Sequence, residues 1–328
     1  MYLIIKKFPQ NLQEAISLIK RAKLNPIKKH IHNVIITGMG SSGIAGKLVE
    51  NLIKDKLSVP LVVNHDYTLP AYVNEHTLLI VVSYSGNTQE TLEAFQIGLK
   101  KKASIIVITS GGELQRIAQE HATDMLPLPK YLPPRASLDH TIVQLLFILY
   151  FHHLINWDFV SEIQSAIQII SDKQASIQIE AEQVAKKIKG YLPVIYTSSL
   201  YEAVAIRLRQ QLNENSKQLC WHHAFPEVNH NEIVGWESSY QNLAVIMFDS
   251  YTADKRLELQ QKIAQDIIKK HTNNFTILYT QGQTELIRSL YLIHLSDWIS
   301  FYLAQTTGVD PMEVKSIDQI KSALYANK

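Results

Sequence analysis

Three hydroxyl side chains lie close together in the run Ser83-Tyr84-Ser85-Gly86-Asn87-Thr88, which follows a short apolar stretch. Ser83, Ser85 and Thr88 could each donate a hydrogen bond to an anion. The run opens a segment of helical pattern, and the N–H groups and dipole of a helix N-terminus favour negative charge. This spacing predicts a loop that binds a phosphate monoester. The alternative is that the hydroxyls only cap the helix, for example Thr88 with Thr91.

An earlier loop, Gly38-Met39-Gly40-Ser41-Ser42-Gly43, also follows an apolar run and opens a helical pattern. We expect Gly40, Ser41 and Ser42 to face the hydroxyl loop and to complete a pocket for one phosphate. The glycines also match the dinucleotide pattern G-x-G-x-x-G, for which an acid is expected about 20 residues later. The candidate acid, Asp66, comes later than that. A nucleotide-dependent oxidoreductase is therefore an alternative that rests on this one loop.

Apolar runs alternate with helical segments along the chain, and a third polar turn, Thr109-Ser110-Gly111-Gly112, follows another such run. Continuous apolar runs between helices are typical of a parallel sheet that is covered on both faces. We expect an α/β fold with two doubly wound halves, each a mainly parallel sheet flanked by helices. Strands are predicted at 34–37, 61–63, 78–83, 105–110, 193–198, 242–248 and 275–279. Helices are predicted at 44–53, 89–100, 113–121, 202–212, 254–270 and 284–305.

The length of 328 residues suggests two domains. The stretch from Leu138 to Lys189 has a helical pattern almost throughout, and the alternation of strand and helix starts again after it. We therefore predict an N-terminal domain at 1–152, a helical link at 153–189 and a C-terminal domain at 190–328.

Composition excludes several classes of partner and location. The formal net charge is +2 with lysines and acids mixed along the chain, which gives no support for nucleic acid or a membrane surface. Cys220 is the single cysteine, so an intrachain disulfide is excluded and a reducing compartment is favoured. The N-terminal residues 1–7 do not resemble a signal peptide, and the apolar stretch 142–155 is too short for a membrane span. A cytoplasmic location is expected.

The run S-Y-S-G-N-T-x-E-T at 83–91 resembles the signature of sugar isomerase (SIS) domains, which bind phosphosugars in this type of loop. Further stretches narrow the resemblance to the bifunctional phosphoglucose/phosphomannose isomerases. These stretches are 38–46, 133–136, 213–217 and 226–233. The resemblance covers nearly the whole chain, with two SIS-like halves.

The resemblance implies a reaction, which interconverts fructose 6-phosphate with glucose 6-phosphate and with mannose 6-phosphate, as in glycolysis and gluconeogenesis. It implies a sugar 6-phosphate substrate, no metal and no organic cofactor. It also implies a homodimer whose active sites lie near the subunit boundary.

Aldose–ketose isomerisation needs a base, a cation beside the enediolate and a group that opens the sugar ring. The resemblance assigns these roles to Glu214, Arg135 and His230, with His230 reaching the neighbouring subunit's site. Glu214 is expected in a polar turn just past a helix. A C-terminal lysine assists ring opening in the family, and Lys321 is the candidate, with Lys315 as the alternative.

Pro134 is expected to contact substrate beside Arg135. Two positions depart from the family pattern, because Ser41 stands where a glycine is common and Met312 where a small hydroxyl residue is common. The alternative from another functional class is a non-catalytic SIS protein that senses a sugar phosphate. Glu214, Arg135 and His230 discriminate between the two, because a sensor needs no base.

Overall fold

The computed structural model describes residues 1–238, 242–249 and 254–326. Internal contacts divide the chain into two units, which are described separately. The N-terminal unit comprises Lys7–Gln168 with Thr284–Leu286, and the C-terminal unit comprises Met1–Lys6, Ile169–Gln283 and Ile287–Lys328. The domain boundaries at 152 and 189 stay a prediction.

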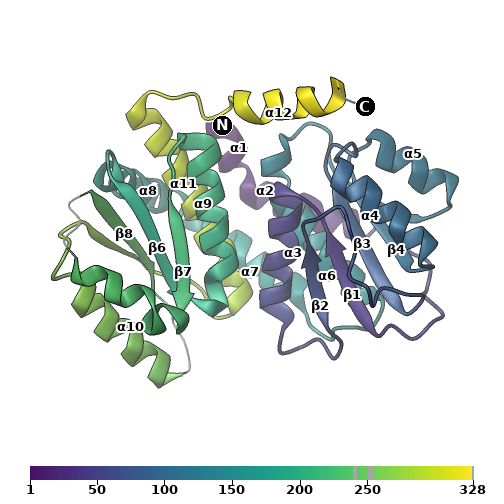
Figure 1. Cartoon of the computed structure of the whole chain (residues 1–328), viewed down its shortest axis with the longest axis horizontal. Coiled ribbons are helices and arrows are strands. Elements are labelled where there is room, and N and C mark those ends of the chain that lie inside the picture. Colours follow the sequence, from purple (N-terminus) through teal and green to yellow (C-terminus); the bar gives the residue numbers. More distant parts are fainter. Residues whose placement is uncertain (239–241, 250–253, 327–328) are drawn as a thin grey trace. The chain divides into compact units, whose positions relative to one another are not determined.

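The N-terminal unit is built on a parallel five-stranded sheet in the order β2-β1-β3-β4-β5 (Figure 1). Its strands are β1 (Asn33–Thr37), β2 (Leu61–Asn64), β3 (Thr77–Ser83), β4 (Ser104–Thr109) and β5 (Asp124–Pro127). The central strand β3 is buried along its whole length, as its continuous apolar run predicts.

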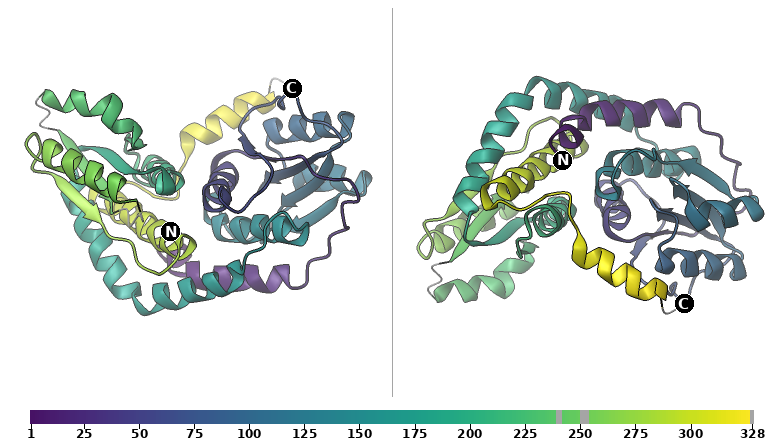
Figure 2. Two further views of the ribbon diagram at one scale, coloured as in Figure 1. Left: turned by 90° about the horizontal axis from the view of Figure 1, so that it is seen from below. Right: turned by 90° about the horizontal axis from the view of Figure 1, so that it is seen from above.

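Helices cover both faces of this sheet (Figures 1 and 2). Ile35 packs in one cluster with residues of α4 (Gln89–Lys100) and α5 (Gly112–Glu120). The neighbouring Ile36 points to the other face, where it lies beneath Gly46 of α3 (Gly40–Ile53). On that side α6 (Leu138–Phe151) contacts both α3 and α2 (Phe8–Ile19).

The C-terminal unit repeats this architecture on a parallel four-stranded sheet in the order β7-β6-β8-β9. Its strands are β6 (Leu192–Ser198), β7 (Trp221–Phe225), β8 (Leu243–Phe248) and β9 (Phe275–Leu278). Its helices include α1 (Tyr2–Lys6), α8 (Gln174–Ile188), α9 (Glu202–Ser216), α10 (Lys255–Ile268), most of α11 (Glu285–Thr307) and α12 (Lys315–Ala326). The predicted α/β class with two mainly parallel sheets is confirmed.

The predicted strands and helices are confirmed with shifts of a few residues at their ends. The long helical stretch is three helices, because α7 (Phe159–Asp172) is separated from α6 by 152–158 and from α8 by Lys173. The helices α1, α2 and α12 and the strands β5 and β7 were not among the predicted elements. Within the described ranges, no helix is long and apolar enough to cross a membrane.

A buried ion pair joins α9 to α11 inside the C-terminal unit. Arg207, 2% exposed, donates from Nε and Nη2 to the two carboxylate oxygens of Asp297 at 3.1 and 3.0 Å. Gln211 donates to the same carboxylate at 2.9 Å. This carboxylate therefore satisfies polar groups on two turns of α9, the helix that carries the predicted base in its last turn.

We expect Asp297→Ala to lower the free energy of unfolding of the C-terminal unit by about 3–5 kcal/mol, because it leaves a buried guanidinium without its counter-ion. A urea titration measures the change. Lys186→Ala is the matched control, because it removes the exposed pair with Glu182, which is worth about 0–1 kcal/mol. Equal losses in the two variants would show that the buried pair does not hold α9 and α11 together.

Candidate active site

Polar loops gather at the carboxyl edge of the N-terminal sheet. Strand β2 pairs on one side of β1 and β3 on the other, so the order in which the chain adds strands to the sheet reverses between β1 and β3. The loops after these two strands, 38–43 and 83–88, flank this switch point. In open α/β sheets, ligands bind in the crevice at such a point. The structure thus brings together the two loops predicted to bind phosphate.

Hydrogen bonds inside the second of these loops, 83–88, separate its three hydroxyls into two kinds. Buried Ser83 donates its proton to Thr88 Oγ1 at 3.0 Å and accepts from the Gly86 N–H. Ser85 Oγ accepts from the Asn87 N–H at 3.2 Å. Because Thr88 and Ser85 act as acceptors in these bonds, each keeps its proton for an acceptor such as a phosphate oxygen. Ser83 shapes the loop, whereas Ser85 and Thr88 can act as donors to a ligand.

The alternative in which the Thr88 side chain caps the helix is not what the structure shows. Thr88 is the N-cap residue of α4, yet its side chain makes no capping hydrogen bond with any residue in the described part of the chain. The first N–H groups of a helix have no partner within the helix itself. At the start of α4 these groups therefore add to the donors at the switch point.

The second loop is interlocked with the third loop, which follows β4. The Asn87 side-chain oxygen accepts from the Glu113 N–H at 2.9 Å, and Gly86 O accepts from the Leu114 N–H at 2.8 Å. Gly86 has a φ of +68°, and a Cβ at this position would lie 1.8 Å from the carbonyl oxygen of Gly111. A glycine is therefore required here by both conformation and space.

Arg135 lies in the short 3₁₀ helix η1 (Pro134–Ala136) and is 8% exposed. The carbonyl oxygen of Pro134 accepts from Ser41 Oγ and from Ser137 Oγ, each at 2.8 Å. The structure thus brings Ser41, Pro134 and Arg135 together. The Ser41 hydroxyl proton is committed to Pro134, so a phosphate contact at Ser41 would come from its backbone N–H at the start of α3.

The structure corrects the predicted location of Glu214. This residue lies within the last turn of α9, which continues to Ser216, and not in a turn beyond the helix. The helix is extended because buried Asn215 donates to Ser300 Oγ of α11 at 2.9 Å, while Ser216 Oγ donates to Ser300 O at 2.6 Å. These tertiary bonds outweigh the weak helix propensity of the polar run.

Lys217 follows in the left-handed conformation with φ +54°. Its ammonium donates to the carbonyl oxygens of Glu214, Asp310 and Glu313 at 2.9, 2.6 and 2.8 Å. A cation at the last carbonyl groups of a helix also interacts favourably with the negative end of the helix dipole. The backbone at Glu214 is therefore fixed from both α11 and the segment after it.

His230 is exposed at the end of η3 (Glu227–His230), and the next 3₁₀ helix, η4 (Glu232–Glu237), follows directly. Glu232 tethers η4 to the sheet: its carboxylate accepts from Tyr196 Oη at 2.6 Å and Trp221 Nε1 at 3.0 Å, and it lies 2.7 Å from His223 Nδ1. Sequence reasoning missed Glu232. The available signal was the alternation of Trp221 and His223, which places both on one face of β7.

The pKa of Glu232 reflects this network. Burial acts to raise it, but the hydrogen bonds from Tyr196 and Trp221 and the contact with His223 outweigh burial and lower the pKa below its usual range. The carboxylate is thus the favoured form, and it secures the segment that carries His230.

Both candidate lysines lie in α12. Lys315, at its first residue, pairs with Glu313 at 2.6 Å, and Lys321 is exposed one to two turns further on. The choice between them stays open. Among the residues that the structure describes, no cluster of three or more His, Cys, Asp or Glu residues is arranged to hold a metal ion.

We expect Gly86→Ala to lower the Tm of the N-terminal unit and to abolish stabilisation by inorganic phosphate, because the methyl group would push the second and third loops apart. Gly190→Ala is the control, since Gly190 also has positive φ but an added Cβ meets only open space within the described residues. That control carries only the conformational cost of about 1–2 kcal/mol. Phosphate stabilisation that survives in Gly86→Ala would contradict the interlocked geometry.

We expect Glu232→Gln to lower stability by about 1–3 kcal/mol at pH 7 by weakening hydrogen bonds to a charged acceptor. A carboxyl group with a lowered folded pKa stabilises above its unfolded pKa, near 4.5, and loses this effect as the pH falls through the folded value. The difference between wild type and variant should therefore shrink as the pH falls below 4.5 and vanish below the folded pKa in urea titrations. A difference that is constant from pH 7 to 3, or equal to that of the exposed control Glu182→Gln, would refute this role.

Comparisons with known proteins identify the family. The model of the SIS domain matches residues 28–154, and that of the bacterial phospho-glucose isomerase C-terminal SIS domain matches residues 177–324. A bifunctional phosphoglucose/phosphomannose isomerase of Caldicellulosiruptor bescii is 36% identical, with 99% of this chain and 98% of that protein covered. The protein of the same name from Aquifex aeolicus is 34% identical, with 89% and 90% covered.

Solved structures show the same fold at low identity. The C-terminal domain of glucosamine-fructose-6-phosphate aminotransferase from Francisella tularensis superposes with a TM-score of 0.74 at 15% identity, with 94% of this chain and 97% of that chain covered. The predicted pair of SIS-type domains is thereby confirmed. With more than a third of its residues identical to a relative along nearly its entire length, the chain belongs to the bifunctional phosphoglucose/phosphomannose isomerase family.

Proposed function

We propose that this protein interconverts glucose 6-phosphate, and also mannose 6-phosphate, with fructose 6-phosphate. The observation that carries the proposal is the match over 99% of the chain to a relative named as a bifunctional phosphoglucose/phosphomannose isomerase. The switch point of the N-terminal sheet supports it, because Ser85 and Thr88 keep hydroxyl protons for a phosphate group.

In this proposal the substrate phosphate binds at the starts of α3 and α4. Ser85 and Thr88 donate from their hydroxyls, and Gly40, Ser41 and Ser42 contribute from the first loop. Ser83 acts through Thr88, which it orients by its 3.0 Å hydrogen bond. Two helix N-termini with several donors favour a dianion over a neutral sugar.

Glu214 serves as the base in this mechanism. In the open-chain aldose phosphate it takes the proton from C2, which gives a cis-enediolate with its charge on O1. A proton then moves from O2 to O1, and Glu214 returns its proton to C1 to give the ketose. The guanidinium of Arg135 stabilises the enediolate oxygen and stays protonated throughout. His230 relays the proton for ring opening, assisted by Lys321 or Lys315, while Pro134 contacts substrate beside Arg135.

We further propose a cytoplasmic homodimer that acts in glycolysis and gluconeogenesis. The exposed side chain of His230 supports the dimer, because a residue that acts in a neighbouring subunit must be exposed in its own. The domain division at 1–152, 153–189 and 190–328 is part of the proposal and is supported by family matches at 28–154 and 177–324.

We expect Glu214→Gln to reduce kcat for isomerisation by at least about 10²-fold, because it removes the base, while sugar-phosphate binding is kept. Assays coupled to a dehydrogenase, with glucose 6-phosphate or mannose 6-phosphate as substrate, measure turnover. Calorimetry with the same substrates measures binding.

Glu202→Gln, at the opposite end of α9, is the matched control and should keep full activity. Undiminished turnover in Glu214→Gln would remove Glu214 from the mechanism. If the wild type binds glucose 6-phosphate but turns over neither substrate, the isomerase proposal is refuted and the alternative of a non-catalytic sensor is favoured. Activity lost with EDTA would show a metal-dependent reaction instead.

A further inference from the structure

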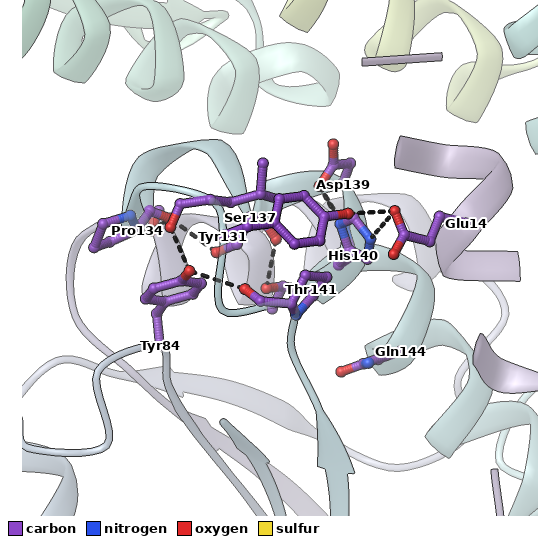
Figure 3. A network of polar contacts seen from close by, with 12 residues as sticks. Glu14, Tyr84, Tyr131, Pro134, Ser137, Asp139, His140, Thr141 and Gln144 are labelled. Atoms are coloured by element: carbon purple, nitrogen blue, oxygen red, sulfur yellow. Dashed lines mark hydrogen bonds and ion pairs between the residues drawn. The ribbon is translucent and has the colours of Figure 1, made fainter. Parts of the chain in front are cut away.

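The segment that carries Arg135 is tied to the phosphate loops by side-chain hydroxyl groups (Figure 3). We call residues 129–141 the Arg135 segment. Tyr84, from the hydroxyl loop, donates from Oη toward Pro129 O at 2.8 Å and also contacts Leu132 O. Tyr84 stands between Ser83 and Ser85, so the residue that reaches the Arg135 segment belongs to the loop that would hold phosphate.

Tyr84 can hold the Arg135 segment in a fixed place relative to the hydroxyl loop. Its own carbonyl oxygen accepts from Ser110 N and Ser110 Oγ at 3.1 and 2.6 Å, which clamps its backbone against the third loop. Burial raises the pKa of Tyr84, so the hydroxyl stays protonated and continues to donate at physiological pH.

Ser41 makes the second connection, from the first phosphate loop. Its hydroxyl donates to Pro134 O, directly before Arg135, and Ser137 donates to the same oxygen from the other side. Both phosphate loops therefore contact the Arg135 segment through a hydroxyl whose acceptor is a backbone carbonyl group.

The two ends of the segment are anchored on other elements (Figure 3). Tyr131 Oη donates to the Glu14 carboxylate on α2, and His140 Nε2 lies 3.8 Å from the same carboxylate. His140 is fully buried, and its Nδ1 lies 2.8 Å from Asp139 Oδ1. With both ends held, the hydroxyls of Tyr84 and Ser41 determine how the middle of the segment sits against the phosphate loops.

We propose that Tyr84 and Ser41 are positioning residues that hold Arg135 in register with bound phosphate, so that phosphate binding is coupled to stabilisation of the enediolate. This inference rests on the proposed isomerase function for its catalytic consequence. The coupling itself rests on the contacts within the N-terminal unit. Neither residue transfers a proton to or from the sugar.

We expect Tyr84→Phe and Ser41→Ala each to lower kcat by about 10-fold, because a displacement on the order of 1 Å costs up to about 10²-fold in a positioned reaction. KM should change less than about threefold, since the donors of Ser85 and Thr88 are kept. In an Arg135→Ala background the same changes should have little further effect, because residues that act through one group are not additive. Tyr150→Phe, on the exposed side of α6, is the control.

A second measurement does not depend on activity. Inorganic phosphate should slow amide hydrogen exchange in 131–137 of wild type, and this slowing should be lost in Tyr84→Phe and in Ser41→Ala although phosphate still slows exchange in 83–88. Slowing that persists at 131–137 in both variants would overturn the coupling. Additive kinetic effects with Arg135→Ala would also overturn it. Wild type without isomerase activity refutes the proposed function, and the exchange data then decide the coupling by themselves.

Discussion

The site depends on one constraint of parallel sheets, which is that all strands deliver their carboxyl ends to the same edge. In the N-terminal unit the order of the strands reverses between β1 and β3, so the loops after these strands, which lead into α3 and α4, flank the switch point at which such sheets bind ligands. Because Gly86 has no side chain, the backbone of the hydroxyl loop packs directly against the backbone of the third loop, which follows β4. The donors are thus fixed by the rigid sheet before any ligand arrives, which limits the entropy lost on binding.

A second constraint is that each hydroxyl has one proton. Four hydroxyl side chains at this edge cannot be told apart in the sequence, yet the structure gives them different hydrogen-bonding roles. Ser83 and Ser41 spend their protons inside the protein, on Thr88 and on Pro134 O. Ser85 and Thr88 accept within the loop and so keep theirs. Scaffold hydroxyls and ligand-facing hydroxyls can be separated only when the direction of every hydrogen bond is known.

Local apolar patterns and contacts between distant segments decide what could be predicted from the sequence. The apolar runs of β1, β3, β4, β6 and β8 are buried on both faces, so periodicity and length identify them. Strand β7 was missed because Trp221, His222 and His223 carry polar groups and form no apolar run; Trp221 and His223 find their common partner, Glu232, only in the folded chain. The end of α9 was placed too early because it is fixed by Ser300 of α11, which no local pattern reveals.

The corrected location of Glu214 changes how the proposed base is held. A glutamate in a turn would carry backbone motion into every proton transfer, whereas a glutamate in the last turn of α9 projects from a backbone held at Asn215, Ser216 and Lys217. A fixed backbone suits the proposed reaction, because one carboxylate must take a proton from C2 and return it to the adjacent C1 without losing its place. The ion pair of Arg207 with Asp297 fixes the same helix two turns earlier, and so it also helps to hold the backbone from which the proposed base projects.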